Sequence, residues 1–250
     1  MNTLNAAPPR KVDMVAPDIV TMRDVAFTWP GRHAFSMTID AFTLPKGKRV
    51  LLIGPSGSGK STFLSLLCGI VVPNRGHIDV LGQDLGKLSG GARDKFRVEH
   101  FGIIFQMFNL LPYGSVRDNV MLPLRFSAAR RTRAAANASA EQEADRLLAA
   151  LGLDRHQFEN TSAARLSVGQ QQLVAAARAL IGRPELIVAD EPTSSLDRNR
   201  QAAFLDLLFA EAGAADATVL MVSHDESLSS RFDEVKHLDG FAKTSRSAAP

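Results

Sequence analysis

The stretch Arg49-Val-Leu-Leu-Ile-Gly54-Pro-Ser-Gly57-Ser-Gly59-Lys60-Ser61-Thr62 contains an apolar run, a glycine-rich loop and a second apolar-periodic segment. This order predicts a strand, a phosphate-binding loop and a helix that begins near Lys60. The loop fits the pattern G-x-x-x-x-G-K-[ST] from Gly54 to Ser61. Glycines there allow backbone N–H groups to close around phosphate oxygens, where a Cβ would obstruct them.

Each part of this loop has an expected chemical role. Lys60 should hold the β- and γ-phosphates of a nucleotide, and the Ser61 hydroxyl should ligate Mg²⁺. The N-terminus of the following helix adds free N–H groups and a positive dipole end. A glycine-rich turn that matches by chance is the alternative, and the flanking strand and helix argue against it. The expected nucleotide ligands are Gly54, Pro55, Ser56, Gly57, Ser58, Gly59, Lys60, Ser61 and Thr62.

Length and composition limit the possible architecture. At 250 residues, the chain is long enough for one sizeable α/β domain with a subdomain, and too short for two such domains in tandem. One nucleotide site per chain is therefore expected. An apolar content of 45% and a charged content of 22% exclude wholesale disorder. The net charge of +3 is small and does not indicate a nucleic-acid-binding protein.

No segment approaches the roughly 18 consecutive apolar residues of a transmembrane helix, and the N-terminus lacks the apolar core of a signal peptide. We therefore expect a cytoplasmic chain without direct insertion into the membrane. The single cysteine, Cys68, follows an apolar run and is expected to be a buried helix residue. Residues 1–18 and 241–250 lack periodicity, so both are expected to be loose tails.

Between Ile19 and Leu44, short alternating patches broken by Trp29-Pro30-Gly31 predict antiparallel strands. Trp29 is the only tryptophan, and it has two interpretations. It could stack on a purine base, a contact worth about 1 to 3 kcal/mol, or it could be a half-buried sheet residue.

A second predicted core strand, Phe101–Phe105, ends at Gln106. Ligands of open α/β sheets gather at the carboxyl ends of strands, so Gln106 could reach a metal or a water there. The following loop, Met107–Tyr113, is rich in apolar side chains and either packs locally or docks a partner. Farther along, the basic cluster of Arg130, Arg131 and Arg133 is interpreted as a solvated helix end, with contact to anionic lipid as the alternative.

The segment Leu166–Gln172 leads directly into an apolar helix. Ser167 is expected to be its N-cap, and Gln170 three residues later completes a capping box. Because Ser167 and Gly169 precede a helix N-terminus, this segment is a second potential phosphate site.

The apolar run Leu186–Ala189 ends in Asp190 and Glu191, which predicts a buried parallel strand that carries two carboxylates to its end. Neighbouring side chains on a strand point to opposite sides, so different roles are expected. Asp190 can approach Mg²⁺, and Glu191 can polarise a water towards the γ-phosphate. An ordinary acidic strand end is the alternative. A further buried strand, Ala217–Ser223, is followed by His224.

Together, the order of these motifs resembles the ATP-binding subunit of an ABC transporter, from about Ile19 to Gly240. The resemblance implies an α/β fold with a P-loop (RecA-like) core and a mostly parallel sheet. An N-terminal antiparallel β subdomain and a helical subdomain inserted at about 107–181 complete one ABC ATPase domain, residues 19–240. It also implies a head-to-tail dimer that holds two ATP molecules, each between one chain's phosphate loop and the other's Ser-x-Gly-Gln signature.

Site roles follow from this resemblance by matching position. Trp29 becomes the aromatic that stacks on adenine, Glu191 the general base and His224 the γ-phosphate switch. Gln106 joins Ser61 and Asp190 around Mg²⁺ and acts in catalysis together with Glu191 and His224. The residues expected to reach the nucleotide or the interface from the second chain are Ser167, Gly169, Gln170 and Asp197.

Within the family, the segments Phe105–Tyr113, Ser115–Val120 and Leu122–Leu124 are similar to ATPases that serve lipoprotein-release, macrolide-efflux and cell-division permeases. That similarity implies mechanical work beneath an integral-membrane permease, and a peripheral location at the inner face of the cell membrane. The sequence departs from the family pattern at Val168, where glycine is usual, and at Leu173, where arginine is common. Ser194 replaces a usual alanine, which should have a mild effect.

Two rival functions remain at this stage. The first is an ABC-type ATPase of DNA repair or translation, but the sequence has neither a long coiled-coil insertion nor two cassettes in one chain. The second is an ATP-gated regulatory subunit with little turnover, which Val168 and Leu173 leave open.

Overall fold

The computed structural model describes residues 17–31, 35–153, 158, 161–194 and 196–246. Within these ranges the strands form two five-stranded sheets. The antiparallel sheet has the order β10-β2-β1-β4-β5, with β10 Ala242–Arg246, β2 Phe35–Pro45, β1 Asp18–Thr28, β4 Arg75–Val80 and β5 Gln83–Asp84. The parallel sheet has the order β6-β7-β8-β3-β9, with β6 Phe101–Ile104, β7 Leu186–Asp190, β8 Thr218–Ser223, β3 Arg49–Ile53 and β9 Glu234–His237.

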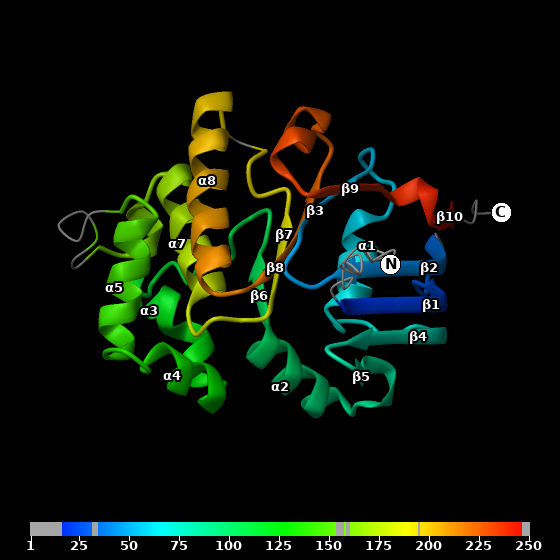
Figure 1. Cartoon of the computed structure of the whole chain (residues 1–250), viewed down its shortest axis with the longest axis horizontal. Coiled ribbons are helices and arrows are strands. Elements are labelled where there is room, and N and C mark those ends of the chain that lie inside the picture. The colour runs from blue at the N-terminus through cyan, green and yellow to red at the C-terminus, as the bar shows by residue number, and fades with distance from the viewer. Residues whose placement is uncertain (1–16, 32–34, 154–157, 159–160, 195, 247–250) are drawn as a thin grey trace, which may run out of the picture.

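The helices cover both faces of the parallel sheet (Figure 1). Their bounds are α1 Lys60–Leu67, α2 Gly90–His100, α3 Val116–Met121, α4 Ala128–Ala134, α5 Ala140–Ala150, α7 Val168–Leu180 and α8 Arg198–Ala214. Short 3-10 segments lie at η1 Leu85–Lys87, η2 Leu122–Arg125, η3 Ala163–Arg165, η4 Glu226–Arg231 and η5 Leu238–Gly240. No helix in the described ranges is long and apolar enough to cross a membrane.

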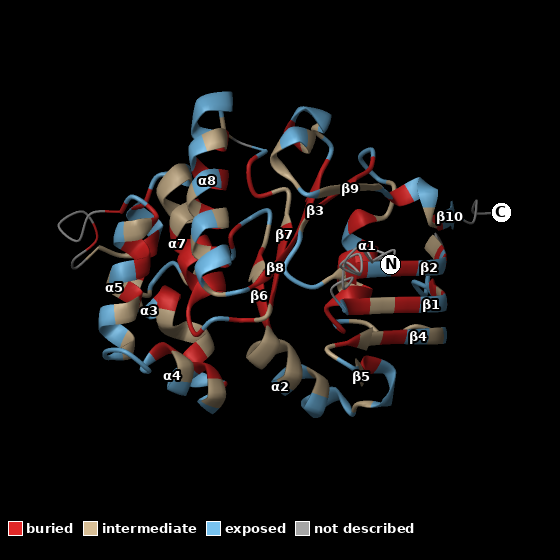
Figure 2. Ribbon diagram, viewed as in Figure 1, coloured by how far each residue is buried: buried red, intermediate tan, exposed pale blue. Residues whose placement is uncertain are grey.

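Alternation along the parallel strands creates two hydrophobic cores. In β3, Val50 and Leu52 belong to the core shared with α1 and the antiparallel sheet. Leu51 and Ile53 belong to the core shared with α3, α5, α7 and α8. Successive side chains of a strand point to opposite faces, and β7, β8 and β3 are buried along most of their length, as Figure 2 shows in red. The helices α1 and α7 therefore lie on opposite sides of the sheet.

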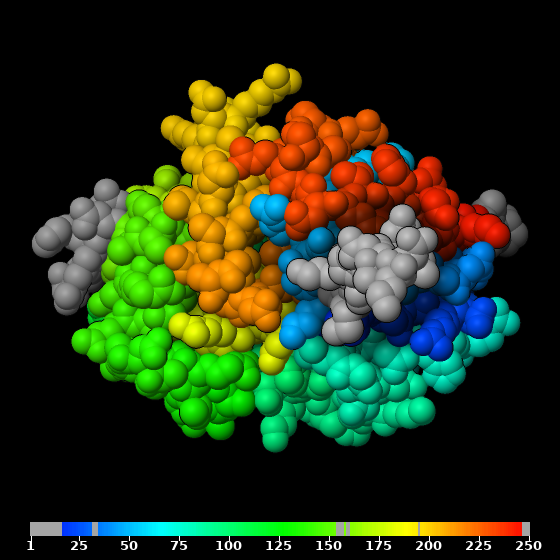
Figure 3. All heavy atoms as spheres, in the orientation of Figure 1, coloured from blue at the N-terminus to red at the C-terminus, as the bar shows by residue number. Residues whose placement is uncertain are grey.

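This arrangement confirms the expected α/β architecture with its mostly parallel core sheet and N-terminal antiparallel sheet. The helices α3, α4, α5 and α7 lie on one side of the parallel sheet, and the antiparallel sheet lies on the other side. In the space-filling view the green helices and the blue-to-cyan strands accordingly lie at opposite ends of the visible face (Figure 3).

The expectation of a loose tail over 241–250 is wrong for Ala242–Arg246, which form β10 and pair antiparallel with β2. The segment Ala-Lys-Thr-Ser-Arg has little apolar alternation, because an edge strand with one buried residue, Ala242, is held mainly by backbone hydrogen bonds. At the other end, Asp18 already belongs to β1. The expectation for residues 1–16 lies outside the described residues.

The interpretation of the arginine cluster as a solvated helix end is wrong for Arg130, whose side chain on α4 is 1% exposed. Arg131 is exposed as expected, and Arg133 is half-buried. Cys68 is buried as expected, and burial raises the pKa of its thiol to about 12. Since a protonated thiol is a poor nucleophile, this cysteine has a packing role.

Candidate functional site

A cavity of about 510 Å³ opens where the loop between β3 and α1 faces the ends of β6 and β7. This volume is in the range of small-molecule sites. The cavity brings together most of the expected phosphate loop, Trp29, Gln106 and both β7 carboxylates. Its lining residues are Trp29, Phe35, Ser56, Gly57, Gly59, Lys60, Ser61, Thr62, Gln106, Asp190, Glu191 and Arg246.

Backbone geometry explains the glycine at position 59. Gly59 has φ +104° and is the N-cap of α1 without a side-chain cap. A Cβ at this position would lie 2.7 Å from Met37 Cε and from Phe35 Cζ, so a larger residue would be both strained and crowded. The loop therefore lies closely under the antiparallel sheet, and α1 begins with N–H groups that no capping side chain satisfies.

Lys60 is the buried cation of the cavity, with 6% of the residue exposed. Its Nζ donates to the carbonyl of Gly54 at 2.8 Å and to that of Pro55 at 3.1 Å. The same Nζ lies 3.2 Å from Glu191 Oε1. These three oxygen atoms match the three donors of the ammonium and fix a positive charge at the wall of the cavity.

The two carboxylates at the end of β7 have different surroundings, although both line the cavity. The expectation that they point to opposite sides of the strand does not apply, because β7 ends at Asp190. Burial raises the pKa of Asp190, and the neighbouring Glu191 charge adds to this effect, while Lys60 and a hydrogen bond from Ser61 oppose it. Glu191 has φ +45°, a left-handed conformation that is costly for a residue other than glycine. Its Oε2 lies 2.9 Å from Nδ1 of His224.

Trp29 is 39% exposed and lines the cavity beside the start of α1. Its indole Nε1 donates to Thr62 Oγ1 at 3.1 Å, and its ring packs edge-on against Phe27. Gln106 follows β6 and is exposed to the same cavity. Trp29 thus lies directly after β1 and lines the cavity, and its stacking on a purine base stays a prediction.

The signature segment lies elsewhere. Ser167 is the N-cap of α7, and its Oγ accepts from the backbone N–H of Gln170, whose Oε1 accepts from the Ser167 N–H. This capping box is the one that the sequence predicts. Among the described residues, none from 166 to 172 lines the cavity. Val168, in place of the usual glycine, is 53% exposed, and Leu173 packs against the helical core.

Several other expected site residues also lie outside the cavity lining. Gly54, Pro55 and Ser58 belong to the loop but do not line the cavity, and the Ser58 hydroxyl is buried without a hydrogen-bond partner in the described structure. Asp197 is the exposed N-cap of α8, where it accepts from the backbone N–H of Arg200 at 3.0 Å. His224 reaches the site only through Glu191.

Two lining residues were not predicted as site residues. Phe35 begins β2, and Arg246 ends β10; the two are paired in the antiparallel sheet. Nη2 of Arg246 donates to the carbonyl of Gly57 at 3.2 Å. No local sequence signal could have indicated this contact, because it depends on the pairing of β10 with β2.

A parallel sheet, a glycine-rich loop with a buried lysine and paired carboxylates at the neighbouring strand end together define a P-loop nucleotide-binding domain. The comparisons with known proteins specify the family. The family model described as ABC transporter matches residues 38–194, so the chain belongs to this family. It is an ATP-binding, ATP-hydrolysing cassette of an ABC transporter, as the sequence resemblance implies.

Individual relatives agree with this assignment. The chain is 38% identical to the uncharacterized ABC transporter ATP-binding protein YbbA of Escherichia coli, over 83% of this chain and 88% of that protein. It is 40% identical to the lipoprotein-releasing system ATP-binding protein LolD 1 of Caulobacter vibrioides, over 76% and 78%. The dimeric structure of the cassette MJ0796 in a post-hydrolysis state with ADP and Pi has a TM-score of 0.76 and 30% identity, with 92% and 99% covered.

Proposed function

We propose that this chain hydrolyses Mg²⁺-bound ATP in a head-to-tail dimer and thereby drives a separate integral-membrane permease. One observation carries the dimer arrangement: the cavity around Lys60 contains no signature residue, while Ser167 lies exposed at the start of α7 beyond the parallel sheet. A second copy can supply the segment Leu166–Gln172 to this cavity. The proposed ATPase unit begins at Ile19, contains the helical insertion 107–181 and, because β10 is part of the sheet, extends to Arg246.

The residues of the cavity fit Mg²⁺-ATP. The Ser61 hydroxyl, the Gln106 amide oxygen and the Asp190 carboxylate are hard oxygen donors of the kind Mg²⁺ prefers. The described residues contain no cluster of three or more His, Cys, Asp or Glu side chains that could hold a metal alone. This suits an ion held partly by substrate phosphates. When bound, Mg²⁺ would neutralise charge on the phosphate oxygens.

In the proposed reaction, Trp29 stacks on the adenine and the phosphate loop binds the phosphates through backbone N–H groups and Lys60. Glu191 orients a water for in-line attack on the γ-phosphorus, and His224 positions Glu191 through their 2.9 Å contact. Across the interface, Ser167 and Gly169 approach the γ-phosphate, with Gln170 supporting the Ser167 backbone and Asp197 contacting the other chain. Most of the rate enhancement comes from positioning and electrostatic stabilisation.

A groove of about 320 Å³ between β6, α4 and η2 is the proposed contact for the permease. Its lining includes the aromatic side chains of Phe105 and Phe126 together with three arginines, Arg97, Arg130 and Arg178. In the loop that follows β6, Met107 and Tyr113 are strongly exposed. A groove that combines apolar and basic side chains suits a short amphipathic segment of a membrane subunit. We propose that this places the dimer at the inner face of the membrane beneath a permease of the lipoprotein-release or efflux type, in line with the names of several relatives.

The Glu191→Gln variant tests this proposal. Loss of the carboxylate should reduce hydrolysis by about 10²- to 10⁴-fold, since the general base is removed, while ATP binding persists. ATP should then hold the variant as a dimer that size-exclusion chromatography with light scattering detects. Glu226→Gln, an exposed carboxylate outside the cavity, is the matched control. Native turnover in Glu191→Gln, or a monomer in saturating ATP, would contradict the proposal.

A further inference from the structure

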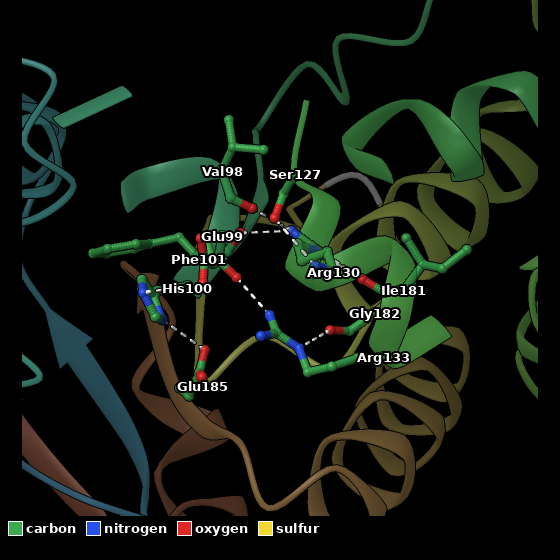
Figure 4. Close-up of polar contacts among 10 residues, drawn as sticks. All are labelled: Val98, Glu99, His100, Phe101, Ser127, Arg130, Arg133, Ile181, Gly182 and Glu185. Carbon is green, nitrogen blue, oxygen red and sulfur yellow. Dashed lines mark hydrogen bonds and ion pairs between the residues drawn. The ribbon is translucent and has the colours of Figure 1, made fainter. Parts of the chain in front are cut away.

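The buried guanidinium of Arg130 donates hydrogen bonds to backbone carbonyls alone among the described residues. Its Nε donates to the Ile181 carbonyl at 2.9 Å, and Nη2 donates to the Ala179 carbonyl at 2.9 Å and again to Ile181. On the other side, Nη1 donates to the carbonyls of Phe101 at 2.9 Å and Val98 at 3.2 Å. Figure 4 shows this side chain reaching from α4 into the space between these segments.

Arg133, one turn later on α4, repeats the pattern. Its Nε donates to the Gly182 carbonyl at 2.7 Å, and its Nη2 donates to the Glu99 carbonyl at 2.8 Å (Figure 4). Each of the two arginines therefore contacts the same two segments: the end of α7 on one side, and the junction of α2 with β6 on the other.

Four of these six carbonyls share a property that explains why arginine is used. Ala179 and Ile181 lie at the C-terminal end of α7, and Val98 and Glu99 lie in the last turn of α2. Carbonyls at helix C-termini lack intrahelical partners and form the negative end of the helix dipole. Two such ends that face the same point repel each other, and a cation between them satisfies both sets of acceptors.

A buried cation that donates no hydrogen bond to a carboxylate is costly, so its position requires a reason. Burial lowers the pKa of Arg130 to about 9, and the neighbouring Arg133 charge acts in the same direction, while the charge of Glu185 opposes both. The side chain still carries its charge near neutral pH. An apolar side chain would avoid this cost, but it would leave the carbonyls without donors and would not fix one geometry.

The backbone segments around the two arginines are closely packed. A Cβ on Gly102 would lie 2.2 Å from the Ala179 carbonyl oxygen, so the start of β6 touches the end of α7 directly. A Cβ on Gly182 would lie 2.6 Å from the Arg130 carbonyl oxygen, so α4 touches the same region. The start of β6, the end of α7 and α4 are therefore in direct backbone contact. A shift of any one of them relative to the other two would break several hydrogen bonds at once.

We propose that Arg130 and Arg133 form a cationic clamp that fixes α7 to the α2–β6 junction and so positions Ser167 for the second chain. This inference rests on the proposed head-to-tail dimer. The clamp lies at one end of α7, and Ser167 begins the other end, so the helix transmits a rotation at the clamp to the signature. Arg130 and Arg133 are positioning residues, since neither lines the nucleotide cavity.

The test compares single-chain ATP binding with dimerisation in the Glu191→Gln background. Arg130→Lys retains the charge but lacks the planar set of donors, so it should weaken ATP-dependent dimerisation by about tenfold or more. The ATP affinity of the single chain should stay within about twofold of the parent, because the Lys60 loop follows the carboxyl end of β3, whereas the clamp lies at the start of β6, at the opposite end of the parallel strands. Arg131→Ala, on the exposed side of the same helix, is the matched control and should change neither value.

If Arg130→Lys folds poorly by circular dichroism, Arg133→Met provides the same test at a half-buried position with two hydrogen bonds. A folded variant that dimerises like its Glu191→Gln parent would overturn the clamp. An equal loss of single-chain ATP affinity and of dimerisation would also overturn it, because that pattern indicates general destabilisation. Failure of the Glu191→Gln parent itself to dimerise would instead refute the proposed function.

Discussion

The phosphate loop Gly54–Thr62 and the signature segment Leu166–Gln172 each lead into a helix, but the N-termini of the two helices are capped differently. At α1 the N-cap is Gly59, which has no side chain, and the first N–H groups remain available beside a buried lysine. At α7 the N-cap is Ser167, and the capping box already satisfies two backbone donors. The first segment borders the cavity, whereas Ser167 and Val168 at the start of the second helix lie exposed outside it.

This difference shows how the binding site is divided. A loop that binds phosphate within one chain keeps its backbone N–H groups and a cation directed at the ligand site. A segment that acts on another chain must stay folded and exposed while it is alone, so its own cap stabilises it. Three experiments separate these two requirements, and the largest effect is expected at the loop.

Lys60→Ala should abolish tight ATP binding, with a loss of about 10²- to 10³-fold, because the buried cation beside the phosphates is removed. Isothermal titration with ATP measures the loss. Lys48→Ala, an exposed lysine close to β3, is the control. Affinity within error of the native protein would show that the loop around Lys60 is not the phosphate site.

Mixing Lys60→Ala with a variant of the signature segment can show whether the phosphate loop of one chain acts with the signature segment of the other. A Cβ on Gly169 meets no atom within 4 Å, so Gly169→Asp should fold normally while placing a carboxylate against the partner's phosphates. Lys60→Ala and Gly169→Asp chains should each be inactive alone and partly active when mixed, because the mixed dimer keeps one intact composite site. No recovery on mixing would contradict a site that is shared between chains.

A smaller effect is expected from Ser167→Ala, which has a matched control in Ser139→Ala. Ser139 caps α5 with Gln142 in the same capping box that Ser167 forms with Gln170. Each change should lower the free energy of unfolding by about 1 kcal/mol. Only Ser167→Ala should also reduce the hydrolysis rate, by about 10- to 100-fold, since one hydrogen bond to a charged phosphate is lost. Equal rates for the two variants would assign Ser167 a purely structural role.

The sequence predicted the parts of the site that depend on neighbouring residues. The loop, the two carboxylates at the end of β7 and the capping box at Ser167 are each complete within a few positions, so local chemistry indicates them. The sequence did not predict that Arg246 lines the cavity or that Arg130 is buried, and the reason is the same for both. Their partners, Gly57 and the ends of α2 and α7, are distant in sequence and are brought together only by the sheet order and by helix packing.

The smallest expected effect concerns Asp190, whose burial in the cavity lowers the stability of the folded chain. Since burial raises the pKa of Asp190 in the folded chain, protonated Asp190 is favoured by folding, and this contribution is lost as the pH rises through the folded pKa. At neutral pH the ionised carboxylate should therefore destabilise the nucleotide-free chain. Asp190→Asn should raise its melting temperature, by about 2–4 °C for each kcal/mol gained. Asp216→Asn, an exposed aspartate, is the control.

The pH dependence makes this last prediction specific. The stability difference between Asp190→Asn and the native chain should be small in acid, where Asp190 is protonated, and should grow as the pH rises to neutral. Melting curves of both nucleotide-free proteins across that range measure it. A difference that stays constant with pH would show that the carboxylate is not destabilised by its surroundings. A difference that grows with pH would show that the ionised Asp190 carboxylate in the cavity lowers the stability of the folded chain, as expected for a group kept for ligand binding. The signature segment contains no buried carboxylate with this effect.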